Sequence, residues 1–235
     1  MDEHQRAKIF DAQTINVREL EKAWIHTNRQ INALILQKNL KAIEVNTKLL
    51  ALIYCALAEA IFSKLIHTPH GLSLDNLEQV KILTNANGVK SGWLKCSELA
   101  MLRVQGAKSS HCQNVLKKLS TMIEAYIFDP SILRNKLAHG QWSIALNRQN
   151  TAVNQEITSE IEAHTVVELY RRKHALEKLA AIIEDIIESP NKAHHRDYWS
   201  HITDFEQSQM KLSSWTYEAK VQQLFAKKAR APDRN

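Results

Sequence analysis

The stretch LLALIYCALAEAIF, residues 49–62, is the most apolar run of the chain. Ile43, Leu50 and Leu57 lie seven residues apart in and around it, so they fall on one side of a helix. Further apolar residues on either side broaden this seam. The spacing therefore predicts a helix over about 42–67 that forms the centre of a helical bundle.

The same run is not expected to cross a membrane. It contains Glu59 and is flanked by Lys48 and Lys64, whereas a spanning helix needs about 20 apolar residues. The first residues, MDEHQRAKIFDAQ, are polar and acidic in part, unlike a secretory signal. The three cysteines are scattered and form no C-x-x-C pair, which fits a reducing compartment. We expect a cytoplasmic protein with no membrane partner.

The composition favours a chain built of helices. Among 235 residues there are only 5 Gly and 4 Pro, too few for a turn-rich β fold. Apolar periodicity and capping residues therefore predict an all-α fold. A loop is expected at 85–92, and Ser73 or Asp75 is expected to cap a short helix. Besides the central helix, the pattern predicts helices over about 15–40, 72–80, 93–105, 109–128, 130–139 and 160–188.

The helix at 130–139 has boundary signals at both ends. Asp129 is expected to be its N-cap and Pro130 to lie in its first turn, so the preceding helix should stop here and a new one start. Gly140 is expected to end the helix.

Two further segments complete the predicted organisation. Residues 142–160, WSIALNRQNTAVNQEITSE, approach a period of two around turn residues, which predicts a small β-hairpin or extended insertion after the helix at 130–139. Residues 191–235 are polar and basic, with a helix expected near 198–226. The chain is therefore expected to consist of a helical bundle over 1–190 and a helical C-terminal extension over 191–235.

The stretch ILRNKLAHGQW, residues 132–142, places polar side chains in an otherwise apolar helix. Asn135 and His139 are four positions apart and share a helix face, so the Asn amide can hold the imidazole in one orientation. Arg134 precedes Asn135 by one position and projects about 100° around the helix from it. Arg134 and His139 can therefore converge on a small anion near the helix end.

Arginine and histidine are the residue types that metal-free RNA cleavage requires. The ribose 2′-OH attacks the adjacent phosphate, and the 5′-oxygen leaves. A guanidinium donates two hydrogen bonds to the phosphate and stabilises the developing charge, while an imidazole accepts or donates a proton. One histidine per chain cannot be acid and base at once. A two-fold dimer that apposes two such helices would supply two of each residue.

The string RNKLAHG, residues 134–140, resembles the R-x4–6-H motif of HEPN domains, which usually begins Arg-Asn and often ends Ala-His-Gly. The resemblance implies a bundle of four or five helices whose protomers pair to form a composite site. It implies a metal-independent endoribonuclease that leaves 2′,3′-cyclic phosphate and 5′-hydroxyl ends. Arg134 and His139 are implied as the catalytic pair and Asn135 as the residue that supports the histidine.

The same resemblance implies a biological setting. HEPN ribonucleases serve as toxins or antiviral effectors in bacteria and archaea, so RNA, a second copy of the chain, and an antitoxin or defence-complex partner are the implied partners. No cofactor is implied. Some HEPN toxins carry a Tyr two residues after the His, where a partner nucleotidyltransferase modifies them. Here that position is Gln141, which departs from that subgroup.

Other interpretations of these residues stay open. Arg134 can be a surface charge and His139 a C-terminal residue that complements the helix dipole. The chain can then be a non-catalytic HEPN-like dimerisation or interaction module. A net charge of +6 is also compatible with a helical protein that only binds nucleic acid.

Glu59 and a group of histidines at residues 194–201 are two further sets of polar residues with more than one possible role. Glu59 either reaches the bundle surface or is partly buried and pairs with Arg134, because a buried carboxylate needs such a partner. HHRDYWSH, residues 194–201, holds three histidines, but their spacing is not a zinc pattern and no cysteine is close in sequence. The sequence thus predicts no metal site there, and these histidines are expected to be exposed.

Overall fold

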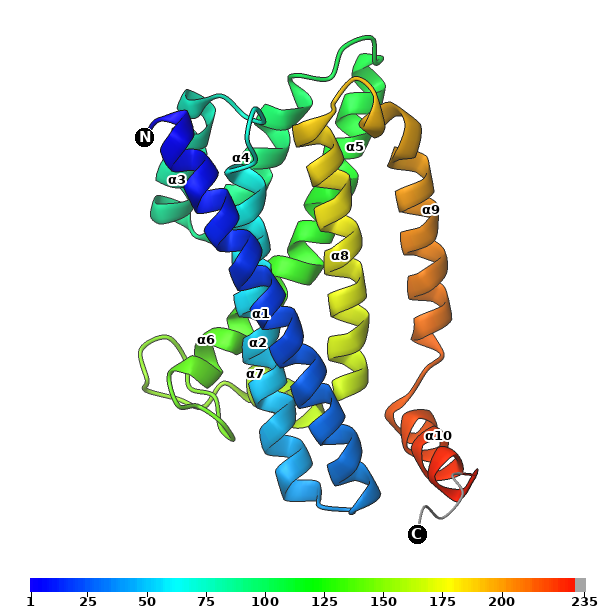
Figure 1. The fold of residues 1–235 in the computed structure, drawn as a ribbon. Coiled ribbons are helices and arrows are strands. Elements are labelled where there is room, and N and C mark those ends of the chain that lie inside the picture. Colours follow the sequence, from blue (N-terminus) through cyan, green and yellow to red (C-terminus); the bar gives the residue numbers. More distant parts are fainter. Residues whose placement is uncertain (231–235) are drawn as a thin grey trace.

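The computed structural model describes residues 1–230, and this part of the chain is helical without a β-strand (Figure 1). The predicted all-α class is confirmed. The elements are α1 Glu3–Leu36, α2 Leu40–Ile66, α3 Leu74–Asn87, α4 Val89–Met101, α5 Ser109–Ile123, the π-helical turn η1 Glu124–Phe128, α6 Asp129–Ala138, α7 Gln155–Ala163, α8 Val166–Glu188, α9 Ala193–Ser213 and α10 Tyr217–Arg230.

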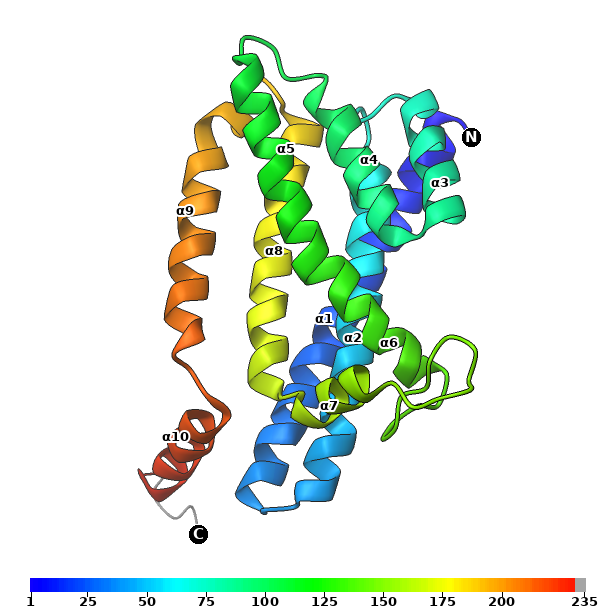
Figure 2. The same ribbon diagram turned by 180° about the vertical axis from the view of Figure 1, so that it is seen from behind.

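Helix α2 lies at the centre of the bundle, as its apolar seam predicts. It packs against α1 along its length and also contacts α4, α6 and α8. Leu50, Tyr54 and Leu57 are each no more than 1% exposed. Figures 1 and 2 show α1 and α2 as a long antiparallel pair with α8 beside them and α5 on the far side. Within residues 1–230, the hydrophobic core lies between these helices.

Helix α2 is also long and apolar enough to cross a membrane, judged by length and composition alone. Half of its most apolar window is buried inside the fold. The core helix of a soluble protein has the same two properties, so this observation fits the central position of α2.

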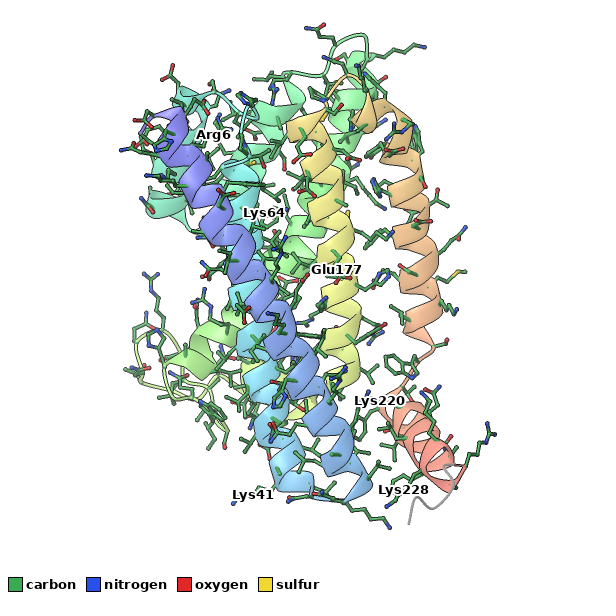
Figure 3. The ribbon with its side chains drawn as sticks, in the orientation of Figure 1. Arg6, Lys41, Lys64, Glu177, Lys220 and Lys228 are labelled. Carbon is green, nitrogen blue, oxygen red and sulfur yellow. The ribbon has the colours of Figure 1, made fainter. Side chains whose placement is uncertain are left out.

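Helix α1 begins much earlier than the expected residue 15. Asp2 and Gln5 form a capping box, with the Gln5 N–H 2.8 Å from Asp2 Oδ1. Arg6 is 1% exposed and donates hydrogen bonds to the carbonyls of Leu72 at 2.7 Å and Thr68. Figure 3 shows Arg6 at this end of α1, against the chain that follows α2. These contacts hold the polar start of the chain in a helix, which apolar periodicity alone did not predict.

The prediction of a loop over residues 85–92 is wrong. Helix α3 continues to Asn87 and α4 starts at Val89, with Gly88 alone between them. Gly88 has φ +85°, so one left-handed residue turns the chain where a loop was expected. The N-cap expected at Ser73 is confirmed, because its Oγ accepts a hydrogen bond from the Asn76 N–H at 3.2 Å.

The prediction that the preceding helix ends before α6 is also wrong. Helix α5 passes through the π turn directly into α6, and both Phe128 and Asp129 have helical backbone angles. Asp129 is therefore the first residue of α6 and not its N-cap. Pro130 lacks an N–H, and the π turn immediately before it changes the hydrogen-bond pattern at the point where a donor is missing.

The segment between α6 and α7 contains an isolated β-bridge in place of a β-hairpin. A single antiparallel bridge joins Leu146 and Val153, and the Asn154 N–H donates to the Ala145 carbonyl at 2.7 Å. No strand forms in this part of the described chain, so the predicted β-hairpin is not confirmed. The helix expected over 160–188 is divided by an extended break, where Thr165 caps α8.

The C-terminal extension contains two helices instead of one. Helix α9 runs alongside α8, and its Tyr198, Ile202 and Phe205 are buried in the same core as the bundle (Figures 1 and 2). The sequence boundary at 190 thus falls at the turn between α8 and α9, but α9 packs as part of the bundle. The last residues of the expected extension, 231–235, lie outside the described residues.

Candidate active site

The C-terminus of α6 presents His139 to solvent. His139 is the C-cap, and Gly140 follows with φ +80°. The Gly140 N–H donates to the Leu137 carbonyl at 3.1 Å, and the Gln141 N–H donates to the Lys136 carbonyl at 2.9 Å. This pair of bonds is a Schellman motif, which needs a left-handed residue after the cap. The helix stop predicted at Gly140 is confirmed, and its geometry leaves the exposed His139 at the helix end.

Apolar contacts on the other side of α6 fix its orientation. Leu133 and Leu137 are each 2% exposed and pack into the core. Trp142 folds back so that its Nε1–H donates to the Leu137 carbonyl at 2.9 Å. With this side buried, the polar residues of the RNKLAHG motif lie on the outer side of the helix.

Arg134 forms an ion pair with Glu59 that joins α6 to α2. The structure combines the two alternatives left open for Glu59: it pairs with Arg134, but it also reaches the surface, with the Glu59 side chain 51% exposed and the Arg134 side chain 32%. An ion pair this exposed stabilises a fold by only about 0–1 kcal/mol. Its main consequence is to hold the Arg134 guanidinium in one place.

Cys55 lies beneath this ion pair without being reactive. Its Sγ is 3.6 Å from the Pro130 carbonyl oxygen. Burial raises the pKa of Cys55 to about 12, against the lowering effect of the Arg134 guanidinium. The side chain therefore stays a neutral thiol at neutral pH and acts as an apolar group under α6.

A cleft of about 560 Å³ opens beside Arg134, between α2, the α3–α4 junction and α6. Lys90 lies at its edge, paired with Glu124 and with its Nζ 4.5 Å from the centre of the Phe128 ring. Phe128 is 36% exposed. The lining residues are Glu59, Phe62, Thr84, Asn87, Gly88, Val89, Lys90, Ser91, Phe128, Ser131, Arg134 and Asn135.

His139 does not line this cleft, although Arg134 and Asn135 do. Residues five apart on a helix are separated by about 140° around the axis and about 7.5 Å along it. No hydrogen bond joins the side chains of Asn135 and His139 within residues 1–230. One chain therefore brings Arg134, Asn135 and Glu59 together and leaves His139 at a separate position.

The cleft contains two residues that sequence reasoning did not identify. Lys90 falls in a segment predicted to be a loop, and Phe128 is the last residue of the helix predicted over 109–128. Neither position carries a local signal, because the cleft is built from three elements that are far apart in the sequence.

A cluster of metal ligands is not found at this site. Across residues 1–230, no group of three or more His, Cys, Asp or Glu side chains is arranged to hold a metal ion. The polar groups of the cleft and of the helix end include the His139 imidazole, the Arg134 guanidinium, the Lys90 ammonium, the Glu59 carboxylate, and amide and hydroxyl groups.

Comparison with known proteins adds no family assignment. No family model matches the chain, and no match is found among curated proteins or solved structures. The resemblance to HEPN domains therefore rests on residues 134–140.

Proposed function

We propose that this chain is a metal-independent endoribonuclease that cleaves RNA by 2′-OH transesterification, with Arg134 and His139 as catalytic residues. The observation that carries the proposal is the RNKLAHG string on α6, whose Schellman end leaves His139 exposed while Arg134 faces a cleft. No other helix end of the described chain combines these residue types with this motif.

The chemistry follows from the functional groups. His139 accepts the proton of the ribose 2′-OH as the oxygen attacks phosphorus. Arg134 donates hydrogen bonds to the phosphorane oxygens and balances their charge. The 5′-oxygen leaves with a proton from a second acid. The products are a 2′,3′-cyclic phosphate and a 5′-hydroxyl end.

A second copy of the chain supplies the missing acid in this proposal. Arg134 and His139 lie on different sides of α6, and only Arg134 reaches the cleft. A two-fold homodimer with apposed α6 helices would bring the His139 side chains of both copies to one phosphate. The composite site would then hold one imidazole as base and the other as acid.

Glu59 is a positioning residue in this scheme. Its carboxylate holds the Arg134 guanidinium through the ion pair between α2 and α6. Because both side chains are partly exposed, the guanidinium keeps free donors for a phosphate. Asn135 lines the same cleft and would contact the substrate or the partner histidine.

The proposed setting is that of a prokaryotic toxin or antiviral defence effector in the cytoplasm. RNA is the substrate, and an antitoxin or a defence complex would restrain the activity. This part of the proposal rests on the resemblance of the motif alone.

A non-catalytic HEPN-like interaction module is the second candidate. It is favoured by apolar side chains beside the motif: Ile144 is 57% exposed and Val153 54% exposed, both in the segment between α6 and α7. Exposed aliphatic residues of this kind serve binding surfaces. Such a module would tolerate changes at His139 and would be sensitive to changes at Ile144.

Cleavage of RNA in EDTA by the purified protein tests the proposal. Wild type should yield cyclic-phosphate ends, whereas the rate for His139→Ala should fall by roughly a hundredfold or more because general acid–base catalysis is lost. His26→Ala is the matched control, since His26 is also exposed but lies on α1. Circular dichroism of all three proteins should be equal. Cleavage that persists in His139→Ala would refute the proposal and favour a contaminating nuclease or another site.

A further inference from the structure

A second cavity lies at the end of the molecule where α5 and α9 begin. Figures 1 and 2 show the starts of these two helices next to each other, away from α6. The cavity has a volume of about 400 Å³. It is lined by Gly106, Ala107, Lys108, Ser110, His111, Asn114, His194, His195, Tyr198 and Trp199.

Two histidines from separate elements point their ring nitrogens at each other in this cavity. His111 is in the first turn of α5 and His194 is in the first turn of α9, 83 residues later. Their Nε2 atoms are 3.4 Å apart. A hydrogen bond through N–H is usually shorter, at about 2.9–3.0 Å. Two imidazole nitrogens bound to one tetrahedral zinc, each at about 2.0–2.1 Å, are separated by about 3.3 Å.

Packing holds both rings in this arrangement. The ring of His194 is fully buried, so the exposure predicted for it from the sequence is wrong, and it lies 5.4 Å from the ring of Tyr198. The ring of His111 meets the edge of the same tyrosine at 5.5 Å. The turn between α8 and α9 is tied to the segment before α5, because the Gln105 N–H donates to Asn191 Oδ1 at 2.7 Å. The ligand positions are therefore set by the fold.

One nitrogen of this histidine pair lacks a hydrogen-bond partner within residues 1–230. The Nδ1 atom of His194 has no hydrogen-bond partner although it is buried. A buried nitrogen without a partner costs free energy. The neighbouring His195 is already engaged, with its Nε2 3.0 Å from the Gln105 carbonyl oxygen. A cation bound to both Nε2 atoms would replace the long contact between them, while the ring proton of His194 would stay on the buried Nδ1.

We propose that His111 and His194 bind one divalent transition-metal ion through their Nε2 atoms. Imidazole ligands favour zinc, nickel and copper over magnesium or calcium. Within residues 1–230 no third ligand completes the set, so water from the open cavity fills the other positions. Two protein ligands and the nearby Lys108 ammonium give the site a modest affinity. The ion would link α9 to α5, and it has no part in the proposed RNA cleavage.

Zinc and nickel titrations of the untagged full chain test this inference. Isothermal titration with Zn²⁺ should give one saturable site in wild type and binding weaker by roughly tenfold or more in His111→Gln. His201→Gln is the matched control, because His201 is on α9 but pairs with Asp185 outside the cavity. Its affinity for Zn²⁺ should equal that of wild type.

Quenching of tryptophan fluorescence tests whether the ion binds at this cavity. The ring of Trp199 lies 6.4 Å from that of His111, so Ni²⁺ at the site should quench it. The quenching should disappear in both Trp199→Phe and His111→Gln. Zn²⁺ should also raise the thermal midpoint of wild type but not of His111→Gln, because an ion that binds only the folded chain stabilises it.

His111→Gln is the primary variant because His111 is only half-buried, whereas loss of the buried His194 could unfold the chain. Zinc binding that is unchanged in folded His111→Gln would overturn the inference. An absence of saturable binding in wild type would do the same and would identify the pair as an ordinary imidazole hydrogen bond.

Discussion

Arg134 and His139 illustrate what a short motif encodes and what it leaves open. Their spacing on α6 fixes the angle between them, so both cannot face the cleft beside α2. The motif also encodes its own helix end, because Gly140 adopts the left-handed conformation that closes the Schellman motif. Burial of Leu133 then decides which side of the helix stays in solvent.

Glu59→Gln tests the positioning role of this carboxylate. The amide keeps the shape of the side chain but removes the charge that holds Arg134. We expect kcat for RNA cleavage to fall by roughly tenfold, while the free energy of unfolding changes by less than about 1 kcal/mol because the pair is exposed. Single-turnover cleavage and urea unfolding measure the two quantities.

The matched control for this variant is Glu177→Gln on α8. Glu177 is 48% exposed and also pairs with a cation, Lys173, but it lies away from the cleft (Figure 3). Its kcat should stay at the wild-type value. Glu59→Asp should recover part of the activity, since it restores the charge. Full activity of Glu59→Gln would show that the ion pair does not position Arg134.

At the scale of elements, the break between α7 and α8 contains a histidine with a perturbed pKa. Burial lowers the pKa of His164 from 6.5 to about 4, and the Arg172 guanidinium acts in the same direction. The folded chain therefore binds a proton at His164 less readily than the unfolded chain. This contribution to stability is fully present above pH 6.5 and is lost as the pH falls toward 4.

We expect the free energy of unfolding to decline between about pH 7 and about pH 4.5 more steeply in wild type than in His164→Gln. The difference should reach at most about 3 kcal/mol, because each tenfold change in proton affinity corresponds to about 1.4 kcal/mol. Urea unfolding at several pH values measures it. His67 and His194 also have lowered pKa values, but they titrate in both proteins, so the difference reports His164 alone. Parallel pH curves for the two proteins would contradict the expectation.

Glycine and proline had different effects in different elements. Gly88 and Gly140 both adopt positive φ, yet Gly88 joins two helices directly whereas Gly140 opens an irregular segment. Pro130 sits within a continuous helical path through the π turn. Local signals therefore marked the points where the chain changes direction, but they did not fix the length of the connection, which depends on packing of the flanking helices.

At the scale of the whole molecule, the composite site predicts complementation between inactive chains. Arg134→Ala and His139→Ala should each be inactive alone. In a mixed dimer the shared site keeps one of its two guanidiniums and one of its two imidazoles, whereas each variant alone lacks one residue type entirely, so we expect partial activity in the mixed dimer. Mixing the variants after subunit exchange should restore a measurable fraction of the wild-type rate.

Sedimentation of the mixture provides the control, since the expectation requires a dimer. A dimer that shows no recovered activity would contradict a shared site in which one imidazole and one guanidinium sustain partial cleavage. A monomer at assay concentration with wild-type activity would exclude the composite site altogether.

The sequence by itself determined the all-α class, the central place of α2, the cap at Ser73 and the end of α6 at Gly140. These features depend on residues within a few positions of one another, so periodicity and capping chemistry reveal them. Only the tertiary structure decided where α1 begins and that α9 belongs to the bundle. The same holds for the cleft beside Arg134 and for the approach of His111 to His194. These features depend on side chains brought together across many residues by packing of the core, which no local pattern encodes.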